Sequence, residues 1–117
     1  MSERHAVKII SSFAKREFYQ KRPMSARVLR LKGKNVLSRG LLPNLSIKEF
    51  PGIRFLVVLD YSDIFRIYYF DKTGKIVGGK NHEKTESFTR RLDKNTKVLY
   101  SLPKKGTQSQ VNVHFCQ

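Results

Sequence analysis

The sequence lacks the features of several protein classes. Its single cysteine, Cys116, excludes an internal disulfide, and structural zinc sites ordinarily use more than one cysteine. No run of roughly 18 uncharged apolar residues occurs, which argues against a membrane-spanning helix. The first residues, Met1–His5, lack the apolar region of a secretory signal. We therefore expect an intracellular protein, in the cytoplasm or in the nucleoid or nucleus, without a bound metal or cofactor.

Acidic residues are also scarce. Nine Asp and Glu stand against 24 Lys and Arg, which gives a formal net charge of +15. A small domain is kept soluble by a net charge of about 2–8 in magnitude, and like charges repel one another within a compact fold. The excess of positive charge therefore indicates a polyanionic partner.

The remaining composition is that of a folded domain. Hydrophobic residues make up 39% of the chain and include eight Phe and five Tyr. Basic residues are concentrated in 1–40 and 80–117, whereas 41–79 is nearly neutral and the most apolar. We therefore expect residues 1–117 to form a single domain, with basic segments surrounding a central core.

Residues 5–21 have the period of an amphipathic helix, which Pro23 would end, although residues 7–10 alone also suit a strand. The apolar side consists of Ala6, Val7, Ile9, Ile10, Phe13, Ala14 and Phe18, and Glu17 interrupts it. The opposite side carries a row without any acid: Arg4, Lys8, Lys15, Tyr19 and Arg22. Such a row is suited to contact successive phosphates. The alternatives are an ordinary solvated face and a helix that lies on a membrane surface.

The rest of the chain divides into strand-like segments separated by turn residues. The two segments richest in branched and aromatic residues, 53–60 and 64–71, indicate an antiparallel hairpin. Further strand-like segments are 26–31, 36–37, 75–78, 98–102 and 111–116. Residues 40–52 suit an irregular connector, and residues 79–96 suit either a short helix near 86–92 or a mobile loop. The predicted fold is α+β: an N-terminal amphipathic helix packed on a mainly antiparallel sheet of about five to seven short strands, which can curl into a small barrel.

A second basic group lies in the predicted sheet. Strand alternation predicts one buried face formed by Ile53, Phe55, Val57 and Leu59. Arg54 then points away from that face, and Arg66 and Tyr68 share one face of the next strand. Arginine and aromatic side chains on an open sheet face can neutralise phosphates and stack on bases. In the alternative interpretation, Tyr68 belongs to the core under the helix and the arginines extend to solvent.

The predicted loops contribute further cations. These are Lys32, Lys34, Lys80, Lys84, Arg90, Arg91, Lys104 and Lys105. The glycine turns near these lysines lack the spacing of a phosphate-binding P-loop. Basic loops suit contact with a nucleic-acid backbone that does not depend on base sequence.

The histidines are the candidates for catalysis. A metal-independent ribonuclease can use two histidines as general base and acid, and His82 and His114 are the pair that could serve. Ordinary structural or surface histidines are the simpler interpretation. Asp60, Asp63 and Asp71 occur at strand ends, where turn capping explains them.

The sequence therefore predicts a non-enzymatic, largely sequence-independent nucleic-acid-binding protein that contacts mainly the phosphate backbone. RNA or single-stranded DNA is favoured over duplex DNA because aromatic residues accompany the arginines. The alternatives are a small ribonuclease of toxin type and a basic module that docks on an acidic protein or a nucleoprotein. A compact basic domain of this kind would fit a viral, phage or mobile-element accessory protein.

Overall fold

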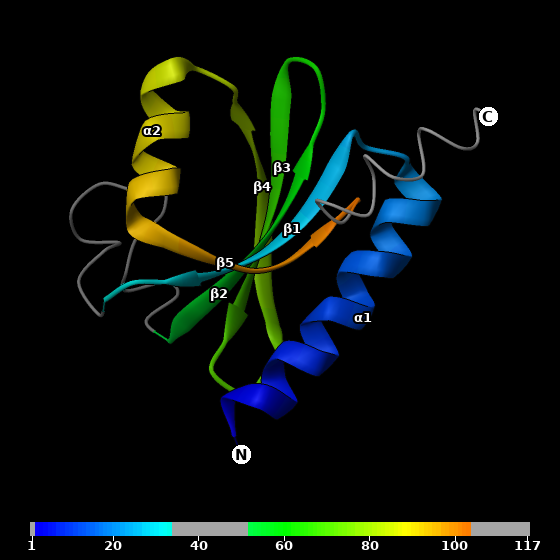
Figure 1. Ribbon diagram of the computed structural model, residues 1–117, viewed down its shortest axis with the longest axis vertical. Helices are drawn as coiled ribbons and strands as arrows, with labels where there is room; N and C mark the ends of the chain where they lie inside the picture. Colours follow the sequence, from blue (N-terminus) through cyan, green and yellow to red (C-terminus); the bar gives the residue numbers. More distant parts are fainter. Residues whose placement is uncertain (1, 34–51, 104–117) are drawn as a thin grey trace.

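The computed structural model describes residues 2–33 and 52–103 (Figure 1). Its elements, in chain order, are α1 (Glu3–Lys21), β1 (Ser25–Leu31), β2 (Ile53–Asp60), β3 (Ile64–Asp71), β4 (Ile76–Glu83), α2 (Glu86–Asn95) and β5 (Thr96–Leu102). The strands form one antiparallel sheet in the order β4-β3-β2-β1-β5. The predicted α+β class is confirmed. The described sheet is open and has β4 and β5 at its edges, so it is not a closed barrel.

Capping interactions define both ends of the N-terminal helix α1. The Ser2 side chain caps its start by accepting a hydrogen bond from the His5 N–H at 3.2 Å. Arg22 adopts the left-handed conformation at the other end, and its N–H donates to the Phe18 carbonyl at 3.1 Å. Pro23 follows and prevents continuation of the helix.

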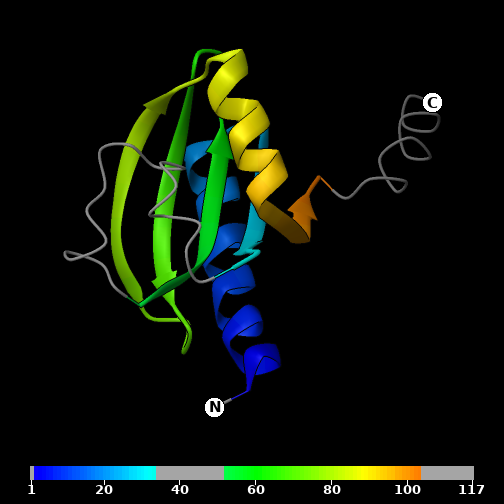
Figure 2. The same ribbon diagram turned by 90° about the vertical axis from the view of Figure 1, so that its left-hand side faces the viewer.

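The sheet is covered on both faces, and Figure 2 shows the two helices on opposite sides of it. The α1 side of the core contains Ala6, Ile10, Ala14, Ala26, Val28, Phe55, Val57, Leu59, Tyr68, Phe70 and Leu102. The α2 side contains Leu29, Leu31, Ile53, Leu56, Val58, Phe65, Ile67, Tyr69, Phe88 and Leu92. Because both faces of β2 are buried, its sequence is an almost continuous apolar run rather than an alternation.

One predicted strand face is wrong in part. Phe55, Val57 and Leu59 do share the α1 side, but Ile53 packs in the cluster on the α2 side. The pairing between β2 and β3 shifts register between Ile53 and Phe55, and such a bulge moves the residues before it to the opposite face.

The C-terminal half holds more regular structure than the sequence pattern indicates. The third strand of the meander, predicted at 75–78, continues as β4 to Glu83. The helical alternative for residues 86–92 is confirmed as α2, whose first turn is capped by Thr85 through a hydrogen bond from the Phe88 N–H at 3.0 Å. The predicted segments 36–37 and 111–116 lie outside the described residues, as does the predicted connector 40–52 except for Gly52.

Candidate nucleic-acid interface

The basic row on α1 faces outward along the helix. All five members predicted from the helical period are exposed, namely Arg4, Lys8, Lys15, Tyr19 and Arg22. Tyr19 is 70% exposed, so an aromatic residue lies open within the row. The row runs along the side of α1 that faces away from the buried residues Ala6, Ile10 and Ala14.

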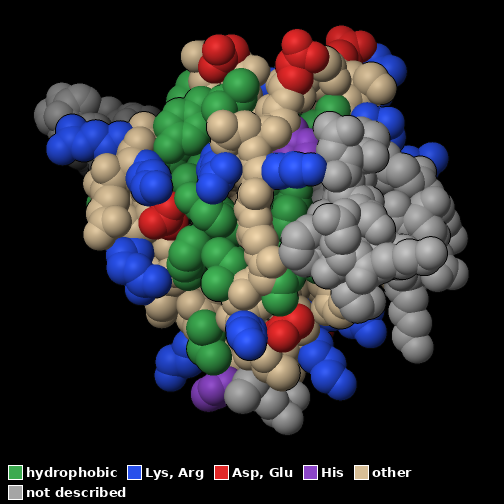
Figure 3. Space-filling view, turned by 180° about the vertical axis from the view of Figure 1, so that it is seen from behind, with side chains coloured by type: hydrophobic (Ala, Val, Ile, Leu, Met, Phe, Trp, Pro, Cys, Tyr) green, Lys and Arg blue, Asp and Glu red, His purple; other side chains and the backbone are tan. Residues whose placement is uncertain are grey.

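Most of the described acidic side chains pair with cations that do not belong to the row on α1. Five of them form ion pairs with cations, and the pairs are Glu3–Arg30, Glu17–Lys21, Asp60–Lys84, Glu86–Arg90 and Asp93–Arg27. By contrast, Arg4, Lys8 and Arg22 form no ion pair with any described residue. Figure 3 shows Lys and Arg side chains spread over another face of the molecule, where Asp and Glu gather mainly at the top. The described acids therefore do not neutralise the positive charge of Arg4, Lys8 and Arg22 on the outer side of α1.

Glu17 interrupts the apolar side of α1 for a structural reason. Its carboxylate accepts a hydrogen bond of 2.7 Å from the Tyr68 hydroxyl on β3, and its side chain is only 12% exposed. Lys21 lies one helical turn further on, with 3.6 Å between its Nζ and the same carboxylate. The acid is thus held inward and does not weaken the outer row.

Two aromatic contacts of α1 were not predicted from the sequence. The Lys15 ammonium lies 5.7 Å from the centre of the Tyr100 ring on β5, which is half-buried. The Arg16 guanidinium lies 5.7 Å from the centre of the Phe13 ring. The first of these cation–π contacts places the Tyr100 ring beside the row, whereas the Phe13 ring packs beneath α1 against Tyr68. Only the pairing of β5 with β1 brings Tyr100 near α1, and no local sequence pattern indicates that pairing.

Tyr68 lies in the core, as the alternative interpretation expected. Only 8% of it is exposed, and its ring meets the Phe13 ring edge-on with 4.9 Å between centres. A ring held in this way is not accessible to a base, which argues against the stacking role considered for Tyr68. The reason is that α1 covers this face of β3.

The two arginines of the predicted sheet group are not brought together. Arg66 pairs in register with Leu59, which is five residues along β2 from Arg54. The Arg66 guanidinium lies 4.9 Å from the centre of the Tyr68 ring and donates to the Asn81 side chain at 3.4 Å. Arg54 instead lines a pocket at the other end of the strand.

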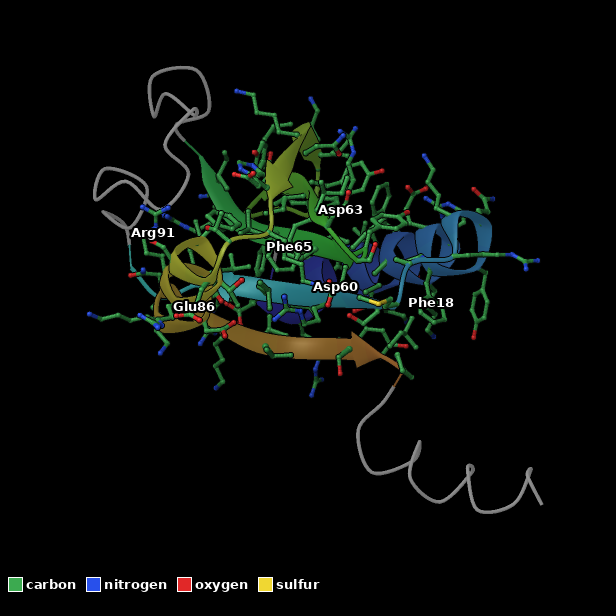
Figure 4. The ribbon with its side chains drawn as sticks, turned by 90° about the horizontal axis from the view of Figure 1, so that it is seen from above. Phe18, Asp60, Asp63, Phe65, Glu86 and Arg91 are labelled. Atoms are coloured by element: carbon green, nitrogen blue, oxygen red, sulfur yellow. The ribbon has the colours of Figure 1, made fainter. Side chains whose placement is uncertain are left out.

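The other predicted cations are dispersed. Arg90 and Arg91 lie on α2, on the other side of the sheet, and Figure 4 shows Arg91 and Glu86 far from Phe18 of α1. Lys84 is held by Asp60 and by the Tyr61 carbonyl at 2.9 Å. Lys32 is exposed directly after β1, and Lys80 is exposed on the edge strand β4. Lys34, Lys104 and Lys105 lie outside the described residues.

His82 is a buried residue of β4 rather than a loop histidine. It is 8% exposed, lies 3.0 Å from the Tyr69 hydroxyl and stacks on the Phe88 ring with 5.1 Å between centres. Burial lowers the pKa of His82, and the nearby Lys80 lowers it further. This position does not suit a general acid or base that must reach a substrate, and its proposed partner, His114, lies outside the described residues.

The buried His82 predicts a pH-dependent stability. Its folded-state pKa lies below the ordinary value of 6.5, so the unfolded chain binds the proton more readily. The stability that neutral His82 contributes is therefore present above 6.5 and is lost as the pH falls through 6.5 towards the folded-state pKa. We expect urea unfolding midpoints to fall between about pH 7.5 and 5.5, a window above most carboxyl titrations. The fall should flatten in His82→Gln and persist in His5→Gln, which alters an exposed histidine of α1. An unchanged fall in His82→Gln would contradict this account.

Comparisons with protein-family models, curated proteins and solved structures found no match to this chain. No helix within residues 2–33 and 52–103 is long and apolar enough to cross a membrane. Within the same ranges, His, Cys, Asp and Glu side chains do not gather in a group of three or more that could hold a metal ion.

Proposed function

We propose that the protein binds nucleic acid through the outer face of α1 and the neighbouring edge strand β5, and that it contacts mainly phosphates. The observation that carries the proposal is the row of exposed cations on α1 that the described acids leave unpaired. The row extends from Arg4 to Arg22, which is roughly 27 Å at a rise of about 1.5 Å per residue. A surface of this length and charge can meet several consecutive phosphates of one strand.

Aromatic groups in this surface favour single strands of RNA or DNA. Tyr19 is exposed within the row, and Tyr100 lies beside Lys15 at the edge of the sheet. Unpaired bases can stack on such rings, whereas the bases of a duplex are already stacked on one another. Phosphate contacts do not read base sequence, so we infer weak base preference.

The salt dependence of binding tests this proposal. Binding of a cationic surface to phosphates releases counterions, so the logarithm of affinity should fall linearly with the logarithm of salt concentration. With roughly six phosphates neutralised on a single strand, we expect a slope of about −4 to −5 in fluorescence-anisotropy titrations. Poly-glutamate serves as an acidic competitor without bases. A flat salt response would contradict the proposal, and so would binding of poly-glutamate as tight as that of single-stranded nucleic acid.

A further inference from the structure

A pocket of about 390 Å³ lies at the end of the molecule where α1 begins. Its charged lining comes from four places in the fold, namely Glu3 on α1, Arg30 on β1, Arg54 on β2 and Lys72 in the turn after β3. Figure 1 shows the start of α1, the start of β2 and the β3–β4 turn at the same lower end of the molecule. The volume falls within the range of about 300–1,000 Å³ that is common for small-molecule sites.

The turn that carries Lys72 is held firmly in place. The Asp71 carboxylate accepts hydrogen bonds from the Thr73 N–H at 2.9 Å and from the Thr73 hydroxyl at 2.6 Å. Burial alone would raise the pKa of Asp71, but hydrogen bonds within the turn outweigh it and hold the pKa below its ordinary value. Gly74 has a φ of +92°, and a Cβ there would lie 3.2 Å from the Ala6 carbonyl oxygen, so the turn packs directly on α1. Lys72 is therefore attached to a rigid wall of the pocket.

The charges of the pocket do not balance. Arg30 donates a hydrogen bond of 2.7 Å to Glu3, and a guanidinium has five N–H donors, so this ion pair leaves donors for a ligand. Arg54 and Lys72 form no ion pair with any described residue. Among the lining residues that the structure describes, three cations thus share one carboxylate, which leaves an excess of two positive charges.

We propose that this pocket binds a phosphomonoester, supplied by the terminal phosphate of a nucleic-acid strand that lies along α1. A phosphomonoester carries a charge of about −1.5 to −2 at pH 7, which matches the excess, whereas an internal phosphodiester carries one negative charge. A pocket at the end of the row accommodates a strand that stops there. The row begins at Arg4, next to Glu3 of the pocket lining, so the inference rests on the proposed function of the row.

The test compares oligonucleotides of one sequence that differ only at their ends. We expect a strand with a 5′- or 3′-phosphate to bind about tenfold more tightly than the same strand with hydroxyl ends, because charge-assisted hydrogen bonds to the dianion are added. Arg54→Gln and Lys72→Gln should abolish this preference and leave the affinity for the hydroxyl-ended strand nearly unchanged. Lys8→Gln is the matched control, since it removes one charge from the row and should weaken both strands by the same factor.

Three outcomes would contradict either the terminal-phosphate site or the proposed binding of nucleic acid. Equal affinity for all ends, or a preference that survives both pocket substitutions, would overturn the inference and leave the proposed function standing. A nucleoside monophosphate that binds as tightly as the phosphorylated strand would also overturn it, because the ligand would then be a free nucleotide. If neither strand bound at low salt, the proposed function itself would fail, which is a different result from loss of the end preference.

Discussion

Reversing the charge of Lys8 and Lys15 together should lower the affinity for single-stranded nucleic acid by roughly 30-fold or more at about 0.1 M salt. On a single strand each lost phosphate contact removes about 0.7 of a unit of the salt slope. Loss of two contacts therefore lowers the affinity strongly, and the new carboxylates repel the backbone. The magnitude of the slope itself should fall by about 1.4. Both side chains are exposed on the outer side of α1, so the fold should be retained, which circular dichroism and the unfolding midpoint will show.

A control with the same net charge separates local contact from the overall field of the protein. Arg90→Glu with Arg91→Glu changes the net charge equally, but on α2, across the sheet from α1. We expect this variant to lose much less affinity than the α1 variant. Equal losses in the two variants would show that nucleic acid responds only to net charge, and unfolding of the α1 variant would show that the helix face is misassigned.

The elements predicted best are those whose signals are local. The period of α1 and its proline stop lie within one stretch of sequence, and the bounds of β2 and β3 follow from strand propensity on either side of a three-residue turn. The outer row of α1 could be identified for the same reason, because its members are related by the helical repeat alone.

The features that were missed depend on contacts between distant segments. Tyr68 and Glu17 are 51 positions apart, and only their meeting explains why an acid lies on the apolar side of a helix. With apolar residues on both faces of β3, the pattern does not reveal which face α1 covers. The sequence pattern places residues 79–83 in a segment that suits a short helix or a mobile loop, yet β4 continues through them to Glu83 and places His82 against Phe88 of α2.

Tyr68→Ala should lower the free energy of unfolding by about 3–5 kcal/mol, the usual cost of truncating a buried aromatic side chain. The ring packs against Phe13 beneath α1, and its removal would leave a cavity between the helix and the sheet. Tyr68→Phe keeps the ring but leaves the Glu17 carboxylate without its hydroxyl donor, and we expect it to cost about 1–3 kcal/mol. Tyr19→Ala is the matched control: Tyr19 is 70% exposed, so stability should change little.

The same three variants distinguish a core tyrosine from a binding tyrosine. At a temperature where all of them are folded, Tyr68→Ala should bind single and double strands with nearly the affinity of the unaltered protein, because its ring never reaches the ligand. Tyr19→Ala should instead weaken binding of single strands by about 1–3 kcal/mol and affect duplex binding much less, since an exposed ring can stack only on unpaired bases. If Tyr68→Ala were fully stable and selectively lost single-strand affinity, the ring would have to leave the α1 interface to stack on a base. If Tyr19→Ala bound both ligands normally, the row would act through its charges alone.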